Sequence, residues 1–148
     1  MAGNKKRIMG LDFGSKTVGV AISDPMLSLA QGIEIIRREK ENKLRKTYAR
    51  IEELISVYDI GLIVLGYPRN MDDSAGERCH KTEGFKDDLI RRTGLDVVLW
   101  DERLTTCEAD MIMDELGIKK EKRHDHVDRI AAAIILQDYL ENQTIKDI

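Results

Sequence analysis

The amino-acid sequence predicts an α/β protein with a mixed five-stranded sheet and helices on both faces. Three short strand patterns come first, joined by brief turns, which is typical of an antiparallel meander. Two buried strands then alternate with helical patterns, which is typical of βα units. A chain of 148 residues with 42% hydrophobic residues suits one core, so residues 1–148 are interpreted as a single domain.

The first three strands are indicated by their apolar patterns. Residues 8–13 form an apolar run that stops at Gly14. Residues 18–22 alternate between branched and small side chains as far as an Asp-Pro turn, and residues 31–37 alternate again. The sequence therefore predicts that the meander is complete before the first helix begins.

Helical spacing replaces this alternation in the rest of the chain. Apolar residues recur at helical intervals over residues 41–58, and a second helix is expected over about 74–92. The short apolar runs at residues 62–65 and 97–100 suit strands buried on both faces. Two more helices are expected, one after the capping box that begins at Thr105 and one that Asp125 or Asp128 can cap.

Composition excludes some classes of protein and leaves others open. No apolar run is long enough to span a bilayer, and the short basic N-terminus lacks a signal-peptide pattern, so we expect a cytoplasmic protein that does not bind membranes. The net charge of −3 counts mildly against a nucleic-acid binder, although the distribution of charge matters more than its sum. Two segments are strongly basic, residues 37–50 and residues 119–123. Each is either a solvated surface or a phosphate-binding surface.

Asp12 is the first candidate for chemistry. It lies at the end of the first predicted strand, and strand ends are where α/β proteins place ligands. Gly14 permits a tight turn and the close approach of a phosphate to the backbone. The alternative is an aspartate that caps its own turn.

Three further carboxylates follow predicted strand or helix boundaries. Asp101 and Glu102 end the last buried strand, and only one of them can share the face of Asp12 because strand side chains alternate. Asp128 stands in the first turn of an apolar helix, where it could simply cap that helix. Carboxylates that converge from rigid elements bind hard divalent cations, and two such ions can catalyse phosphodiester hydrolysis.

Four motifs, in order along nearly the whole chain, resemble those of the YqgF/RuvX family. They are Asp12-Phe13-Gly14-Ser15-Lys16 with Val18-Gly19-Val20-Ala21, Gly66-Tyr67-Pro68-Arg69-Asn70-Met71-Asp72, Asp101-Glu102-Arg103-Leu104-Thr105-Thr106, and Val127-Asp128 with Ile130-Ala131-Ala132. The resemblance implies a ribonuclease H-like fold related to Holliday-junction resolvases. It also implies a nuclease that completes the 5′ end of pre-16S ribosomal RNA.

The same resemblance implies roles for individual residues. Asp12, Glu102 and Asp128 are the expected catalytic, metal-binding acids for Mg²⁺ or Mn²⁺, with Asp101 as the substitute if the other face is used. By the same resemblance, Asn70, Arg103 and Thr105 are expected to orient the site or to meet the substrate backbone. Lys16, and Lys120 and Arg123 in the basic segment that leads to Asp128, are expected from their charge to hold phosphates without reading sequence.

Other functions remain open at this point. A Holliday-junction resolvase acting on four-way DNA would require a dimer, and the sequence leaves monomer and homodimer equally open. An ATP-binding protein of the sugar-kinase type also begins with an Asp-x-Gly turn, but it needs two such halves, and this chain is long enough for one. A non-catalytic RNA-binding assembly factor is a third alternative, although converging acids repel phosphate unless metal is bound.

Overall fold

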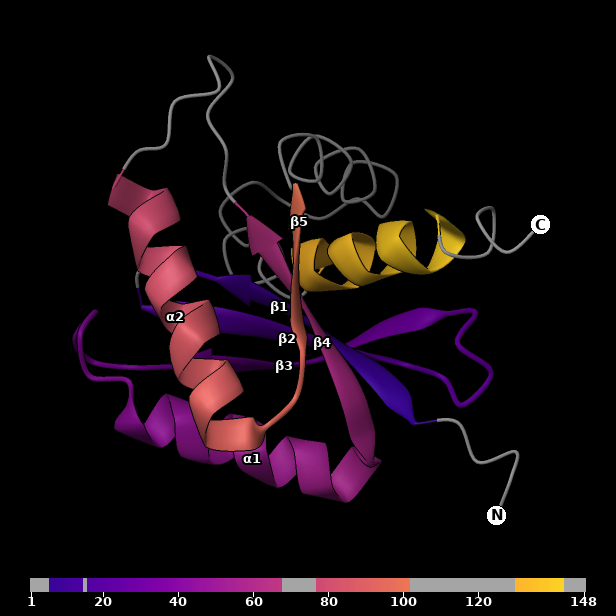
Figure 1. The fold of residues 1–148 in the computed structure, drawn as a ribbon, viewed down its shortest axis with the longest axis horizontal. Coiled ribbons are helices and arrows are strands. Elements are labelled where there is room, and N and C mark those ends of the chain that lie inside the picture. The colour runs from indigo at the N-terminus through magenta and orange to yellow at the C-terminus, as the bar shows by residue number, and fades with distance from the viewer. Residues whose placement is uncertain (1–5, 15, 68–76, 102–129, 143–148) are drawn as a thin grey trace, which may run out of the picture.

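A five-stranded sheet in the order β3-β2-β1-β4-β5 organises the protein in the computed structural model, which describes residues 6–14, 16–67, 77–101 and 130–142 (Figure 1). The mixed sheet that the sequence predicts is therefore confirmed. Its strands are β1 (Arg7–Phe13), β2 (Thr17–Ser23), β3 (Ala30–Arg37), β4 (Ile60–Tyr67) and β5 (Val97–Asp101).

Strand direction brings four strand ends to one edge of this sheet. β2 pairs antiparallel with both β1 and β3, whereas β4 pairs parallel with both β1 and β5. β1, β3, β4 and β5 therefore run the same way and end at a common edge, called here the carboxyl edge. The predicted meander is confirmed, and the candidate residues Asp12 and Asp101 both lie at the carboxyl edge.

Helices cover both faces of the sheet (Figure 1). Helices α1 (Arg45–Tyr58) and α2 (Glu77–Thr93) pack on one face, called here the two-helix face. A C-terminal helix, residues 130–142, packs on the opposite, one-helix face. No helix in the described part of the chain is long and apolar enough to cross a membrane.

The alternation of strand side chains divides the core between these faces. Met9 and Leu11 of β1 are fully buried on the two-helix face, where Phe13 stacks on Phe85 of α2 with ring centroids 4.1 Å apart. Ile8 of β1 and Val64 of β4 are buried on the one-helix face against the C-terminal helix. β1 and β4 are thus covered on both sides, as buried parallel strands usually are.

The first helix begins later than the sequence pattern predicts. We expected it from residue 41, whereas α1 begins at Arg45. The chain before it is held in a turn, because the backbone N–H of Lys43 donates to the carbonyl of Lys40 at 3.1 Å. Arg38 Nε also donates to the carbonyl of Glu41 at 3.0 Å, so contacts outside the helix hold this carbonyl.

The other predicted elements agree where the structure describes them. α2 is present from Glu77, and the last helix is confirmed over residues 130–142. The helix predicted after Thr105 lies outside the described residues.

Gly10 allows the C-terminal helix to approach β1 closely. A Cβ atom at Gly10 would lie 2.7 Å from Leu136 Cβ and 3.0 Å from the carbonyl oxygen of Ala132. Both distances are shorter than ordinary contacts between heavy atoms, so any larger residue would push the helix away from the sheet. The hydrogen atom of glycine therefore sets the separation of helix and strand beside Asp12.

We predict that Gly10→Ala lowers the free energy of unfolding by about 1–3 kcal/mol, because the added methyl overpacks this contact. Gly84→Ala in α2 is the matched control, since nothing lies within 4 Å of a Cβ placed there. The control should stabilise the protein by up to about 1 kcal/mol through helix propensity. Urea denaturation of both variants measures this difference. Equal stabilities for Gly10→Ala and the natural protein would contradict the packing described here.

Candidate active site

Asp12 occupies the carboxyl end of β1, one residue before the strand ends. Its side chain is partly buried, and its register partner on β2 is Gly19, which places no side chain opposite it. Gly10 and Ile8, two and four residues earlier, contact the C-terminal helix. Strand periodicity therefore puts Asp12 on the one-helix face of the sheet.

β5 ends beside β4 at the same edge, with Asp101 in register with Tyr67. Val97 and Leu99 pack with the core of the two-helix face, whereas Val98 and Trp100 pack with the one-helix face. Trp100 Nε1 donates to Asp138 Oδ2 of the C-terminal helix at 2.8 Å. Even-numbered positions of β5 therefore share the face of Asp12, and Asp101 belongs to the odd-numbered series.

The C-terminal helix crosses the one-helix face and is held there by polar contacts. Gln137 Oε1 accepts from the backbone N–H of Ala30 at 2.8 Å, and Gln137 Nε2 donates to the carbonyl of Ser28 at 3.0 Å. Nearer its start, Ala132 lies against Gly10, two residues before Asp12. The start of the described helix therefore lies near the strand that carries Asp12.

The turn after Asp12 is tied to the end of β3. The backbone N–H of Gly14 donates to the carbonyl of Thr17 at 2.7 Å, which closes the turn between β1 and β2. Arg38 Nη2 donates to the carbonyl of Gly14 at 2.6 Å, and its guanidinium lies 5.0 Å from the Phe13 ring centroid. A charged hydrogen bond to Gly14 and a cation–π contact with Phe13 thus hold the start of this turn.

Gly14 has a steric reason to be glycine. A Cβ there would lie 2.9 Å from Thr17 Oγ1 and 3.1 Å from the Thr17 carbonyl oxygen. Lys16 lies in the same turn with an exposed side chain, and its carbonyl accepts from the backbone N–H of Arg38 at 2.9 Å. Gly14 and Lys16 are predictable from the sequence, whereas Arg38 stands out there only as one charge in a basic segment.

The structure therefore brings two of the predicted site residues, Asp12 and Lys16, to one edge, with Asp101 ending β5 at the same edge. The remaining predicted site residues lie outside the described residues, and they are Glu102, Asp128, Asn70, Arg103, Thr105, Lys120 and Arg123. Within the described ranges, no three metal-ligating side chains cluster.

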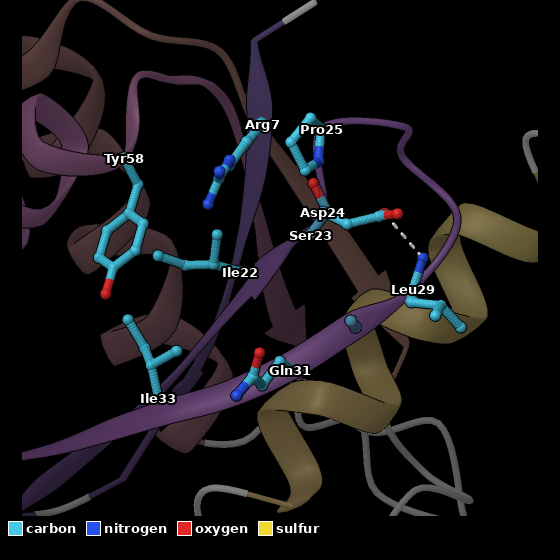
Figure 2. A pocket seen from close by; sticks show the side chains of 10 residues that line it. Arg7, Ile22, Ser23, Asp24, Pro25, Leu29, Gln31, Ile33 and Tyr58 are labelled. Atoms are coloured by element: carbon cyan, nitrogen blue, oxygen red, sulfur yellow. Dashed lines mark hydrogen bonds between the residues drawn. The ribbon is translucent and has the colours of Figure 1, made fainter.

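A hollow of about 510 Å³ lies at the opposite edge of the sheet, where β1 begins (Figure 2). Arg7 and Tyr58 line it, with the guanidinium carbon 5.8 Å from the ring centroid. Its one carboxylate, Asp24, accepts from the backbone N–H groups of Leu29 and Ser28, and these bonds hold the pKa of Asp24 below its usual range. This carboxylate fixes its own loop, so the hollow does not resemble an acid-based catalytic site.

Two proteins of similar sequence align with nearly the whole of this chain. A protein from Agathobacter rectalis is 62% identical over 91% of this chain and 94% of its own length. One from Lachnospira eligens is 56% identical over 93% of this chain and 98% of its own length. Both carry the name "Putative pre-16S rRNA nuclease".

Solved structures share the fold at low sequence identity. RuvC of Thermus thermophilus, in complex with a Holliday junction substrate, superposes with a TM-score of 0.55 at 15% identity, covering 95% of this chain and 96% of RuvC. The fowlpox virus Holliday junction resolvase gives a TM-score of 0.55 at 16% identity, covering 93% of this chain and 99% of the resolvase. The fold is therefore ribonuclease H-like, as the sequence resemblance implies.

One family model matches the part of the sequence that forms this sheet and its carboxyl edge. The model described as "RuvX: Holliday junction resolvase" matches residues 6–142, which include every motif used above and all the described elements. This chain belongs to the RuvX family.

Proposed function

We propose that this chain is a metal-dependent nuclease of the cytoplasm that hydrolyses phosphodiester bonds in the 5′-end maturation of pre-16S rRNA. The position of Asp12 carries the proposal, because a partly buried carboxylate ends the central strand at the edge where four strands finish. Membership of the RuvX family and the names of relatives up to 62% identical support the activity and the substrate. Residues 1–148 are taken as one catalytic domain.

Asp12, Glu102 and Asp128 are the proposed metal ligands. The side-chain series of β5 supports Glu102 over Asp101, because Val98 and Trp100 share the face of Asp12 and 102 is the next even position in the sequence. The path of the C-terminal helix supports Asp128, which precedes the described helix by two residues. Carboxylate oxygens from separate rigid elements suit Mg²⁺ or Mn²⁺.

Two such ions, when bound, would activate a water molecule and stabilise the leaving oxygen. The residues of the chain hold the metal-binding carboxylate in position and supply positive charge for the phosphates. β1 is buried on both faces, so it holds the Asp12 carboxylate on a rigid support. Lys16, Lys120 and Arg123 would neutralise phosphates, and Asn70, Arg103 and Thr105 would orient the site without selecting a sequence.

A four-way DNA junction is the second candidate substrate. The family model is described as a Holliday junction resolvase, and the fold is shared with a resolvase solved on that substrate. Symmetrical cleavage of a junction would require a homodimer with two sites, whereas cleavage of a precursor rRNA would not.

The proposal is tested by cleavage of labelled single-stranded RNA, single-stranded DNA, a four-way junction and a model rRNA precursor, each with Mg²⁺ or Mn²⁺. We expect metal-dependent cutting that falls about 100-fold or more in Asp12→Asn, which removes a metal ligand with little change in shape. Asp87→Asn is the matched control, because Asp87 is exposed on α2 and has no ion-pair partner among the described residues. It should cut like the natural protein.

Preference for the rRNA precursor would support ribosomal processing, and preference for the junction would support a resolvase. Cutting that persists in Asp12→Asn would show that another nuclease contaminates the sample or that Asp12 is not catalytic. No cutting of any substrate with either metal would leave the non-catalytic assembly factor as the better hypothesis.

The choice between neighbouring acids gives a separate prediction. Glu102→Gln should reduce metal-dependent cleavage about as much as Asp12→Asn, whereas Asp101→Asn should reduce it by less than about tenfold, because its position belongs to the opposite side-chain series. Circular dichroism of both variants checks that they fold. The reverse ranking in cleavage rate would place the metal ligand at Asp101.

A further inference from the structure

A basic hollow of about 520 Å³ lies where β3 ends and α1 begins. Five of its lining side chains are cationic, and one, Glu39, is a carboxylate. This cavity is called here the basic hollow, and its cationic lining residues are Arg37, Arg38, Lys43, Arg45 and Lys46. A hollow with this excess of positive charge favours an anionic ligand.

Two carboxylates that precede α1 in the chain, Glu34 and Glu41, are held by cations outside the hollow. Glu34 forms an ion pair with Arg50 at 2.7 Å, and Glu41 forms one with Lys81 at 2.6 Å. The pKa of Glu34 is lowered by its hydrogen bond from Arg50, which is consistent with a firmly held ion pair. These acids therefore do little to neutralise the hollow.

Three cations of the hollow remain available to a ligand. The side chains of Lys43, Arg45 and Lys46 are exposed, and in the described part of the chain none of them forms an ion pair. The first turn of α1, which carries Arg45 and Lys46, has no acidic residue. Glu39 is therefore the one carboxylate in the lining of the hollow, and five cations outnumber it.

The basic hollow belongs to the same edge of the sheet as Asp12. β3 and β1 run in the same direction with β2 between them, so their carboxyl ends are about 10 Å apart, twice the usual strand spacing. Arg38 joins the two places physically, because it lines the hollow and also donates to the carbonyl of Gly14 in the turn after Asp12. A polyanion lying along this edge could meet both.

We infer that the basic hollow binds the phosphodiester backbone of the nucleic-acid substrate, a few nucleotides away from the bond that is cut. This inference rests on the proposed function, since it places a second contact for the same substrate. Several exposed cations in a row suit the repeated charges of a backbone better than a single small anion. Such contacts position a substrate without reading its bases, so RNA and DNA strands should both respond to their loss.

The test is the affinity of Lys43→Ala/Lys46→Ala for labelled single-stranded RNA and for a four-way DNA junction, measured in EDTA so that no cutting occurs. Affinity should fall about tenfold, and the slope of log affinity against log salt should shrink by about 1.4–1.8 for two lost phosphate contacts. The matched control is Lys86→Ala/Arg91→Ala on α2, which removes the same charge away from the basic hollow. The control should keep at least half of the natural affinity.

Unchanged affinity and slope in Lys43→Ala/Lys46→Ala would overturn the inference, as would an equal loss in the control, which would indicate a general charge effect. The inference would also be overturned if neither nucleic acid is bound by the natural protein in EDTA and by the slow-cutting Asp12→Asn variant with Mg²⁺ present. The proposed function is judged separately by cleavage with metal. If the natural protein cuts but Lys43→Ala/Lys46→Ala binds as tightly as the natural protein, only the basic hollow is rejected. If the variant binds more weakly as expected but the natural protein cuts no substrate, only the nuclease activity is rejected.

Discussion

The burial of β1 on both faces holds the sheet and the three helices of the described chain together. This strand is covered by α1 and α2 on one face and by the C-terminal helix on the other, and it pairs with β2 and β4 at its edges. Gly10 makes this possible, because only a hydrogen atom fits between β1 and the backbone of Ala132. Asp12 extends from this enclosed strand, so its position is set by the whole fold rather than by its own loop.

The edge beside Asp12 is organised by Arg38. This side chain donates to the carbonyls of Gly14 and Glu41, and its guanidinium lies over Phe13. It therefore connects the end of β1, the turn after it and the chain that leads into α1. If the basic hollow binds a backbone phosphate, Arg38 couples that binding to the turn that follows the proposed catalytic acid.

The sequence predicts the elements well because their patterns are local. The alternation in the first three strands and the apolar runs of β4 and β5 are all confirmed. The start of α1 is missed, because its preceding turn depends on the contact between Arg38 and Glu41 rather than on helical periodicity.

For the site, the sequence identifies Asp12 as a candidate and predicts that one of the two acids Asp101 and Glu102 shares its face. Identifying which side-chain series faces Asp12 requires the packing of Trp100 on the C-terminal helix. The contact of Arg38 with Gly14 spans 24 positions, so no local pattern reveals it.

Asp12 is proposed to bind a divalent metal at the carboxyl edge. This proposal is tested without any substrate by titrating the protein with Mn²⁺ and measuring the free ion by electron paramagnetic resonance. We expect the natural protein to bind Mn²⁺ and the Asp12→Asn variant, once shown to be folded, to bind it at least about tenfold more weakly. Equal Mn²⁺ affinity in the two proteins would contradict the proposal.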